Sequence, residues 1–398
     1  MPKKGSSGEG KEQLNVDTVQ LVNNAIFSAS TLVNMAIYAI LEAPQELYFG
    51  SHSEKNLNVL EKVVLDIEVV EGGRVIQKRI VKPYYSPTKQ RGIERRTIAY
   101  SLVKTRSGLV PYYKYFNLGI DVTDTYSNGV PDPRDILTFL WGATWTRPTA
   151  YIRGRIGYGG GVAVQGTFER KQRNRVDYNI YEAVTKTSKE GGESEEQEAG
   201  DEGYETAQTL WMKEYAEPHL LIPVVRHGML LGVENYEPHA VAYAFLQSLA
   251  LAGAGTPKSI SILEAYWLDG NRRDKAIVVD IGPWLLLEPV TISPAIMSPV
   301  EALGIFREKA LKHKENICKE TDPDKIFKAL KNTPRKEGVE QGSVSYPNAP
   351  IRLIGNDAYE FLKKLADEFV DKYLANIEQL NIPRVEKLKQ YVRTSTST

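Results

Sequence analysis

The residues best suited to chemistry in this chain are basic and aromatic, and many of them gather in residues 147–175. This segment holds seven basic side chains against one acid, Glu169, with a glycine run at 159–161. Guanidinium groups pair with phosphates, aromatic rings stack on bases, and glycines let a backbone approach a ligand closely. The segment is therefore a candidate for gripping a nucleic-acid backbone, although the glycine run could equally be a tightly packed turn. Its candidate contact residues are Arg147, Tyr151, Arg153, Arg155, Tyr158, Arg170, Lys171, Arg173 and Arg175.

A second basic segment covers residues 74–106, which contain ten basic residues and one acid, Glu94. Pro83, Pro87 and Gly92 lie within it and predict an exposed, mobile loop. One interpretation is auxiliary contact with nucleic acid, and the alternative is a solvated arm whose charges only keep the chain soluble. The auxiliary candidates are Lys89, Arg91, Arg95 and Arg96, together with Lys258 in a later glycine-rich loop.

The chain as a whole is neutral, with 50 basic and 50 acidic residues among 398. A neutral protein that binds nucleic acid must concentrate its positive charge on part of its surface. Acids are concentrated in residues 190–205, where eight of them lie among glycines and serines. We expect a disordered, solvated insertion there, and the alternative is a mimic of nucleic acid that touches a neighbour's basic groove.

No pattern typical of a catalytic or metal site accompanies the basic segments. The five histidines lack ligand spacing, and Cys318 is the single cysteine, so a cysteine-cluster zinc site and an internal disulfide are both excluded. The sequence contains neither a nucleophile elbow nor a phosphate-binding P-loop. We therefore expect a binding protein with no catalytic residue, metal or cofactor, in a reducing cytoplasm. Polar residues interrupt the apolar stretch 21–41, which argues against a membrane span.

The elements expected to position these residues form an α+β pattern. Residues 33–41 alternate with apolar side chains on both faces, which predicts a core strand covered on both sides. Residues 63–70 and 74–83, joined through Gly72 and Gly73, predict a hairpin. Further strands are expected at 100–103 and 112–122, helices at 132–142, 239–252 and through most of 299–398, and a flexible tail at 1–13.

Three segments of this chain resemble the backbone subunit of archaeal CRISPR interference complexes, the "Cas seven" family of the RAMP superfamily. Residues 135–160 are similar to the family's helix followed by an Arg-Thr-Xaa-Arg-Tyr-Gly type segment, most of all in the type I-D branch. The pieces AYSL at 99–102 and YFN at 115–117 resemble the strands that precede it there. Residues 174–233 resemble the type I-A branch, in which a polar, thumb-like insertion returns into a strand, and residues 240–258 take the place of the second core helix and its RNA-facing loop. This chain departs from the type I-D branch in one respect. That branch often has a zinc site formed by cysteines, and this chain has only one cysteine.

The resemblance implies an RRM-like (ferredoxin-like) core sheet with helices and large insertions acting as palm and thumb. Combined with the composition, it divides the chain into a tail (1–13), a core (14–298) and a helical C-terminal region (299–398), the core carrying a basic loop (74–106) and an acidic thumb-like insertion (186–209). It also implies a non-catalytic subunit of a type I (Cascade) complex, of type I-D or I-A kind, that polymerises along the CRISPR RNA. The implied partners are CRISPR RNA, target DNA, copies of the same chain in a helical filament and the other subunits, with no membrane.

Two other functions remain open at this point. One is a target-RNA-cleaving backbone subunit of a type III-like complex, which uses a loop aspartate after the first strand. No aspartate occurs between Asp17 and Asp66, which counts against it. The other is a structural or interaction protein of an archaeal mobile element, whose basic segments serve solubility or packaging.

Overall fold

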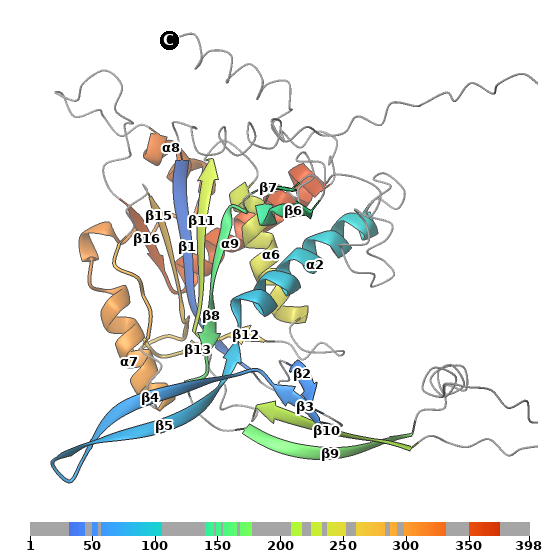
Figure 1. The fold of residues 1–398 in the computed structure, drawn as a ribbon. Helices are drawn as coiled ribbons and strands as arrows, with labels where there is room; N and C mark the ends of the chain where they lie inside the picture. Colours follow the sequence, from blue (N-terminus) through green and yellow to red (C-terminus); the bar gives the residue numbers. More distant parts are fainter. Residues whose placement is uncertain are drawn as a thin grey trace, which may run out of the picture.

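The computed structural model is a mixed α+β protein built around a central, mostly antiparallel sheet (Figure 1). The structure describes residues 32–43, 50–54, 57–105, 140–146, 149–152, 154–164, 168–176, 208–216, 224–232, 237–251, 260–282, 287–292, 298–331 and 350–374. Among the described residues no helix is both long and apolar enough to cross a membrane.

The central sheet has the strand order β16-β15-β1-β11-β8-β5-β4, and a short strand, β12, also pairs with β1. Its strands are β1 (Leu32–Glu42), β4 (Lys62–Glu71), β5 (Arg74–Tyr85), β8 (Ile156–Val162), β11 (Val224–Gly232), β12 (Ser261–Ile262), β15 (Ile277–Gly282) and β16 (Ile351–Ile354). Smaller sheets join β2 (Gly50–Glu54), β3 (Leu57–Leu60), β10 (Gln208–Ala216) and β9 (Phe168–Val176); β6 (Ala143–Thr146) and β7 (Thr149–Ile152); and β13 (Glu264–Ala265) and β14 (Asp274–Lys275). The α-helices in the described ranges are α2 (Pro87–Thr105), α6 (Glu237–Leu251), α7 (Pro299–Ala310), α8 (Pro323–Lys331) and α9 (Asn356–Glu368).

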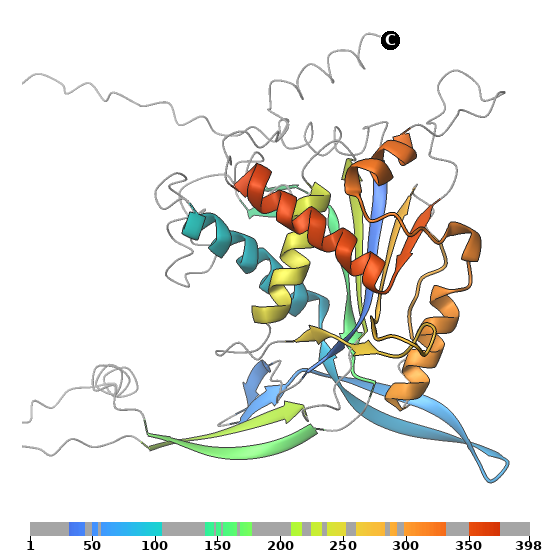
Figure 2. The same cartoon turned by 180° about the vertical axis from the view of Figure 1, so that it is seen from behind.

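Strand β1 is the centre of the core, and the prediction of a strand covered on both faces is confirmed. Met35, Ile37, Ala39 and Leu41 belong to an apolar cluster with residues of α6, α8 and α9. The alternate residues, represented by Tyr38 and Ile40, belong to a second cluster with α7 on the opposite face. Both faces of the strand are buried because the alternation is apolar in both phases. Figure 2 shows α2, α6 and α9 together over one face of the sheet and α7 separate from them.

The path of the chain through the sheet interleaves two helices with four strands. In chain order the elements run β1, α2, β8, β11, α6, β15, with the hairpins and smaller sheets inserted between them. In space the four strands lie in the order β15-β1-β11-β8, and every neighbouring pair is antiparallel. Each helix therefore connects strands that are not adjacent in the sheet.

The predicted hairpin is confirmed as β4 and β5, which project from the body of the protein (Figure 1). Gly72 and Gly73 form its turn with φ values of 59° and 77°, a conformation that L side chains rarely adopt. The root of the hairpin joins the central sheet where Tyr84 and Tyr85 pair with β8.

The predicted loop within residues 74–106 is wrong, because its second half forms the helix α2. Pro87 lies at the start of the helix, where its missing N–H costs no hydrogen bond. Ser86 precedes it and accepts a hydrogen bond from the backbone N–H of Lys89 at 3.4 Å, as a capping residue does. The strand predicted at 100–103 is also wrong, since these residues continue the helix.

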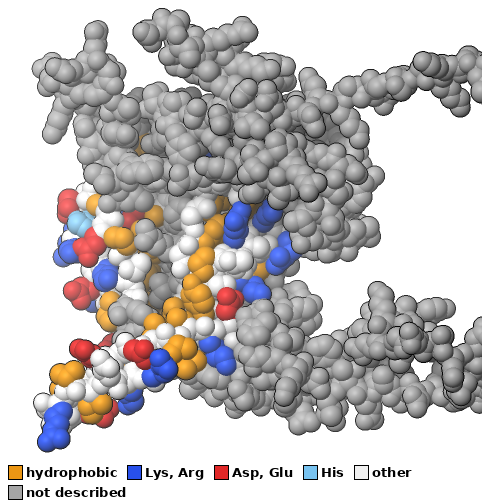
Figure 3. All heavy atoms as spheres, viewed as in Figure 1, with side chains coloured by type: hydrophobic (Ala, Val, Ile, Leu, Met, Phe, Trp, Pro, Cys, Tyr) orange, Lys and Arg blue, Asp and Glu red, His pale blue; other side chains and the backbone are white. Residues whose placement is uncertain are grey.

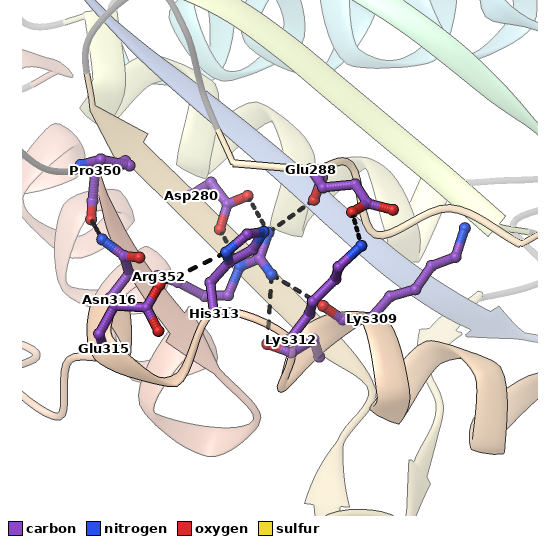
Figure 4. A network of polar contacts seen from close by, with 10 residues as sticks. Asp280, Glu288, Lys309, Lys312, His313, Glu315, Asn316, Pro350 and Arg352 are labelled. Carbon is purple, nitrogen blue, oxygen red and sulfur yellow. Dashed lines mark hydrogen bonds and ion pairs between the residues drawn. The ribbon is translucent and has the colours of Figure 1, made fainter.

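The C-terminal region contains helices as predicted, and it also adds a strand, β16, to the edge of the central sheet. Arg352 of β16 is fully buried and donates two hydrogen bonds of 2.7 Å to the Asp280 carboxylate on β15. The same guanidinium donates to the backbone oxygens of Lys309 and Glu288, each at 3.0 Å (Figure 4). This network joins β15, β16 and the end of α7, and the described helices α7, α8 and α9 pack into the same cores as the sheet. The division into domains stays a prediction.

Several predicted elements lie outside the described residues. These are the tail at 1–13, the strand at 112–122, the helix at 132–142 apart from its last three residues, and the acidic insertion at 186–209 apart from its last two residues. Those last two residues begin β10.

Candidate nucleic-acid interface

Helix α2 presents a basic face to solvent. Arg91 and Arg96 are exposed, and Lys89 and Arg95 are half-buried at the borders of the same face. The one acid of the helix, Glu94, is fully buried, so the outward charge of the described part of α2 is entirely positive. Figure 3 shows lysine and arginine side chains gathered over this helix. A face of this composition attracts phosphates.

The opposite face of α2 is held against the body of the protein. Ile93 and Ile98 are buried, and Ile93 belongs to the main apolar cluster. Near the other end of the helix, the hydroxyls of Ser101 and Tyr243 of α6 lie 2.7 Å apart and share a hydrogen bond. These contacts fix which side of the helix faces solvent.

Tyr158, predicted to stack on a base, lies in a buried hydrogen-bond chain beneath α2. Its hydroxyl accepts from the indole Nε1 of Trp141 at 2.5 Å and donates to Oε2 of Glu94 at 3.0 Å. Burial raises the pKa of this hydroxyl well above its usual value, and the Glu94 carboxylate raises it further, so the hydroxyl stays protonated and donates. The hydroxyl of Tyr158 is therefore held by two neighbours, and the stacking of its ring on a base stays a prediction.

Arg155, predicted to contact phosphate, is paired with an acid in the interior. Its Nη1 forms an ion pair with Oε1 of Glu237 at the start of α6, and the exposed fractions of the two side chains are 7% and 0%. A guanidinium in this position neutralises a buried carboxylate and does not reach solvent. The buried ion pair thus corrects the assignment of Arg155 to the RNA surface.

The glycine run at 159–161 forms part of β8, and its central residue is there for close packing. Gly160 has a φ of 65°, and a Cβ at this position would lie 2.8 Å from both the Tyr85 carbonyl oxygen and the Pro87 Cδ. The strand also shifts register against β11 at this point. Gly160 is therefore tightly packed, which is the second of the two interpretations of the glycine run. Because it has no side chain, the start of α2 can approach the sheet.

The basic cluster at 170–175 lies on β9, which pairs with β10 along its whole length. Arg170 is opposite Glu214, Lys171 is opposite Lys213, and Arg175 is opposite Thr209. With Arg173, four of the nine residues of the strand are basic. The cluster is therefore on the edge strand of the four-stranded sheet β2-β3-β10-β9, and its contact with RNA stays a prediction.

The remaining candidates give no further geometry. Arg147, Arg153 and Lys258 lie outside the described residues. Tyr151 is in β7, where its backbone pairs with Thr144 of β6.

The charge imbalance of residues 74–106 is smaller in the structure than in the sequence, because β4 supplies acids to β5. Arg79 is paired with Asp66 at 3.0 Å, and Lys78 with Glu71 at 3.1 Å. Lys82 is buried and donates to the Val164 carbonyl oxygen at 2.8 Å; burial lowers its pKa to about 8. Within the hairpin, these three basic side chains are therefore held by partners of the protein itself.

Two residues in the contacts that hold α2 were missed in the sequence, Glu94 and Trp141. The available signal was the isolation of Glu94 as the single acid in a strongly basic segment. A single acid in such a segment is a candidate for a buried, hydrogen-bonded side chain that fixes the segment to the core. Trp141 gave no such signal. Across the described ranges, no group of three or more His, Cys, Asp or Glu side chains is placed to hold a metal ion.

The fold and site together define an α+β protein that exposes a basic helix beside a buried acid, a combination suited to holding a polyanion. No protein-family model matches the chain, and no curated protein matches it. Among solved structures, it is similar to a chain titled "Type IV-B CRISPR Complex", with a TM-score of 0.30 and 7% sequence identity. The alignment covers 57% of this chain and 89% of the other. Similarity at this level does not establish a shared fold.

Proposed function

We propose that this chain is a non-catalytic, RNA-binding backbone subunit of a type I CRISPR interference complex. In this role it polymerises along the CRISPR RNA, holds a short stretch of its backbone and leaves the bases open for pairing with target DNA. The observation that carries the proposal is the basic face of α2, formed by Lys89, Arg91, Arg95 and Arg96. The sequence resemblance to the "Cas seven" family supplies the biological setting.

The strand order supports the RRM-like core that this proposal requires. A ferredoxin-like sheet arises when a β-α-β-β-α-β unit places its fourth strand beside its first and its third between its first and second. The path β1, α2, β8, β11, α6, β15 and the spatial order β15-β1-β11-β8 fit that description. Both connecting helices, α2 and α6, pack on the same side of the sheet (Figure 2).

The chemistry of the α2 face suits a guide-holding subunit. Contacts to phosphates position an RNA without reading its sequence, and a backbone subunit must hold any guide. Arg91 and Arg96 present charge to solvent, whereas the one amide side chain of the helix, Gln90, is buried and faces away from solvent. The face therefore offers phosphate contacts and no base-reading amide.

The test removes two charges from the α2 face in the double variant Lys89→Gln/Arg96→Gln. We expect weaker binding to single-stranded RNA of any sequence, with the slope of log K against log salt reduced by about 0.7 per lost phosphate contact, or about 1.4 for both. Fluorescence anisotropy with two labelled RNAs of unrelated sequence, over a range of salt concentrations, measures both quantities.

The matched control is Lys312→Gln/Lys325→Gln, which removes the same charge from two exposed lysines that are each paired with an acid. It is expected to bind as the wild type does. Equal affinity and equal salt slope in the α2 variant and the wild type would rule out the assignment of RNA contact to α2.

The biological setting is tested separately by purifying the chain without nuclease treatment from cells that express a CRISPR array. A guide-holding subunit should retain RNA of a fixed length whose sequence maps to the array. RNA of random length and origin would contradict this setting and favour a packaging or interaction protein.

A further inference from the structure

The hydrogen-bond chain beneath α2 links three segments that lie far apart in the sequence. Trp141 donates to the Tyr158 hydroxyl, and Tyr158 donates to Glu94, which is 0% exposed. The separations along the chain are 17 and 64 residues. Glu94 is thus linked to β8 by the hydrogen bond from Tyr158. The Tyr158 hydroxyl accepts in turn a hydrogen bond from the indole of Trp141.

A second bond joins the same indole residue to the exposed edge of α2. The Nη2 of Arg91 donates to the Trp141 carbonyl oxygen at 2.5 Å, so Trp141 bonds directly to the basic face of the helix and is linked to its buried face through Tyr158. Trp141 is itself confined, since a Cβ on Gly154 would lie 2.7 Å from its carbonyl oxygen. The neighbouring Leu140 carbonyl oxygen accepts a hydrogen bond of 2.9 Å from the backbone N–H of Arg155.

These contacts determine the rotation of α2 about its own axis. A buried carboxylate is tolerated only where donors satisfy it, and a rotation by one residue, about 100°, would carry Glu94 away from Tyr158. The same rotation would turn Arg91 and Arg95 away from their present direction. Moving the Glu94 carboxylate away from the Tyr158 hydroxyl would thus cost free energy, and this cost holds the basic face in one orientation.

We propose that Trp141, Tyr158 and Glu94 are positioning residues that orient the RNA-binding face of α2 without touching RNA. The inference rests on the proposed function of that face and assigns Tyr158 a role other than base stacking. It predicts that removing one buried oxygen atom weakens RNA binding at a distance.

The test is Tyr158→Phe, which keeps the ring and removes the hydroxyl that donates to Glu94. We expect about tenfold weaker RNA binding, on the scale of one lost hydrogen bond to a charged group, in protein that remains folded by circular dichroism. We also expect faster amide hydrogen exchange in α2 than in the wild type. The second variant, Tyr158→Phe/Glu94→Gln, removes the charge that has lost this donor and should recover most of the lost affinity. A stacking role for Tyr158 predicts instead no loss in Tyr158→Phe, because phenylalanine keeps the ring.

Tyr266→Phe is the matched control, because it removes a hydroxyl from a tyrosine that is 63% exposed. It should change neither binding nor exchange in α2. If the wild type binds RNA and Tyr158→Phe binds equally well with unchanged exchange in α2, the positioning inference is wrong while the proposed function stands. If the wild type does not bind RNA, the proposed function is wrong. Amide hydrogen exchange of α2 in Tyr158→Phe then decides alone whether these hydrogen bonds orient the helix.

Discussion

At the scale of single residues, the buried ionic groups carry the most structural information. Arg155, Glu94 and Arg352 all lie in the interior, and each has a partner from another segment of the chain. Arginines that look available in a sequence are therefore divided between two roles, anchoring and binding. Burial decides which role each one has, because a buried guanidinium must be neutralised where it sits.

Arg352→Met tests how strongly one such anchor stabilises the fold. The change strands the Asp280 carboxylate and removes the donor to the Lys309 and Glu288 carbonyl oxygens. We expect the free energy of unfolding to fall by about 3–5 kcal/mol, as measured by chemical denaturation. The control Lys325→Met removes an exposed lysine from its ion pair and should change stability little. A small loss in Arg352→Met would mean that water or a rearranged side chain satisfies Asp280.

At the scale of elements, α2 carries the face that we propose for RNA, and it contains a half-buried glycine, Gly92. Gly92 has no positive φ, and the nearest side-chain atom that a Cβ there would meet is Nη1 of Arg96, at 3.2 Å. Because Arg96 is exposed and its side chain is flexible, it can move aside. The glycine therefore lowers the stability of the helix without a backbone requirement for it.

Gly92→Ala should raise the free energy of unfolding by up to about 1 kcal/mol, since alanine is the better helix former. The measurement is denaturation with urea, and the matched variant is Gly304→Ala in α7, where a Cβ meets no atom within 4 Å. Gly304→Ala should give the full gain, and Gly92→Ala the same gain reduced by the displacement of Arg96. A loss of stability in Gly92→Ala would show that the arginine cannot move.

At the scale of the whole molecule, the C-terminal helices are integrated with the sheet and its covering helices. His239 of α6 is 8% exposed and lies 3.3 Å from the Glu368 carboxylate of α9. Burial lowers the pKa of His239; Glu368 and Asp324 oppose this effect, and Lys372 adds to it. The net direction is a folded-state pKa below the usual value, so protonation favours the unfolded chain.

The stability contributed by neutral His239 should therefore be fully present above its unfolded pKa of about 6.5 and be lost as the pH falls through the lower folded-state value. Denaturation of the wild type and of His239→Gln at a series of pH values from about 8 to 5 measures this contribution. The two curves should converge in their pH dependence above neutrality and separate below it. A wild type that gains stability relative to His239→Gln on acidification would show that the ion pair with Glu368 dominates instead.

Much of the secondary structure was predictable from local patterns. The apolar alternation of β1 and the double glycine between β4 and β5 act over a few residues, and both predictions are confirmed. Helix α2 was misread because Pro87 and Gly92 suggest a loop, although proline is compatible with the first turn of a helix and one glycine is tolerated within it. The capping by Ser86 was present in the sequence and could have corrected this.

The sequence by itself determined that the chain concentrates basic residues in two segments and has an α+β pattern. Only the tertiary structure decided which of those residues face solvent. Arg155 is buried because Glu237, 82 residues away, needs a counter-charge, and Tyr158 is occupied because Glu94 needs a donor. The physical reason is that the balance between solvation and pairing of a charge depends on neighbours brought together by folding, which spacing along the chain does not encode. Arg155 and Tyr158 of the segment at 147–175 thus serve as interior anchors, its basic cluster on β9 stays a prediction, and the basic face that we propose for RNA lies on α2.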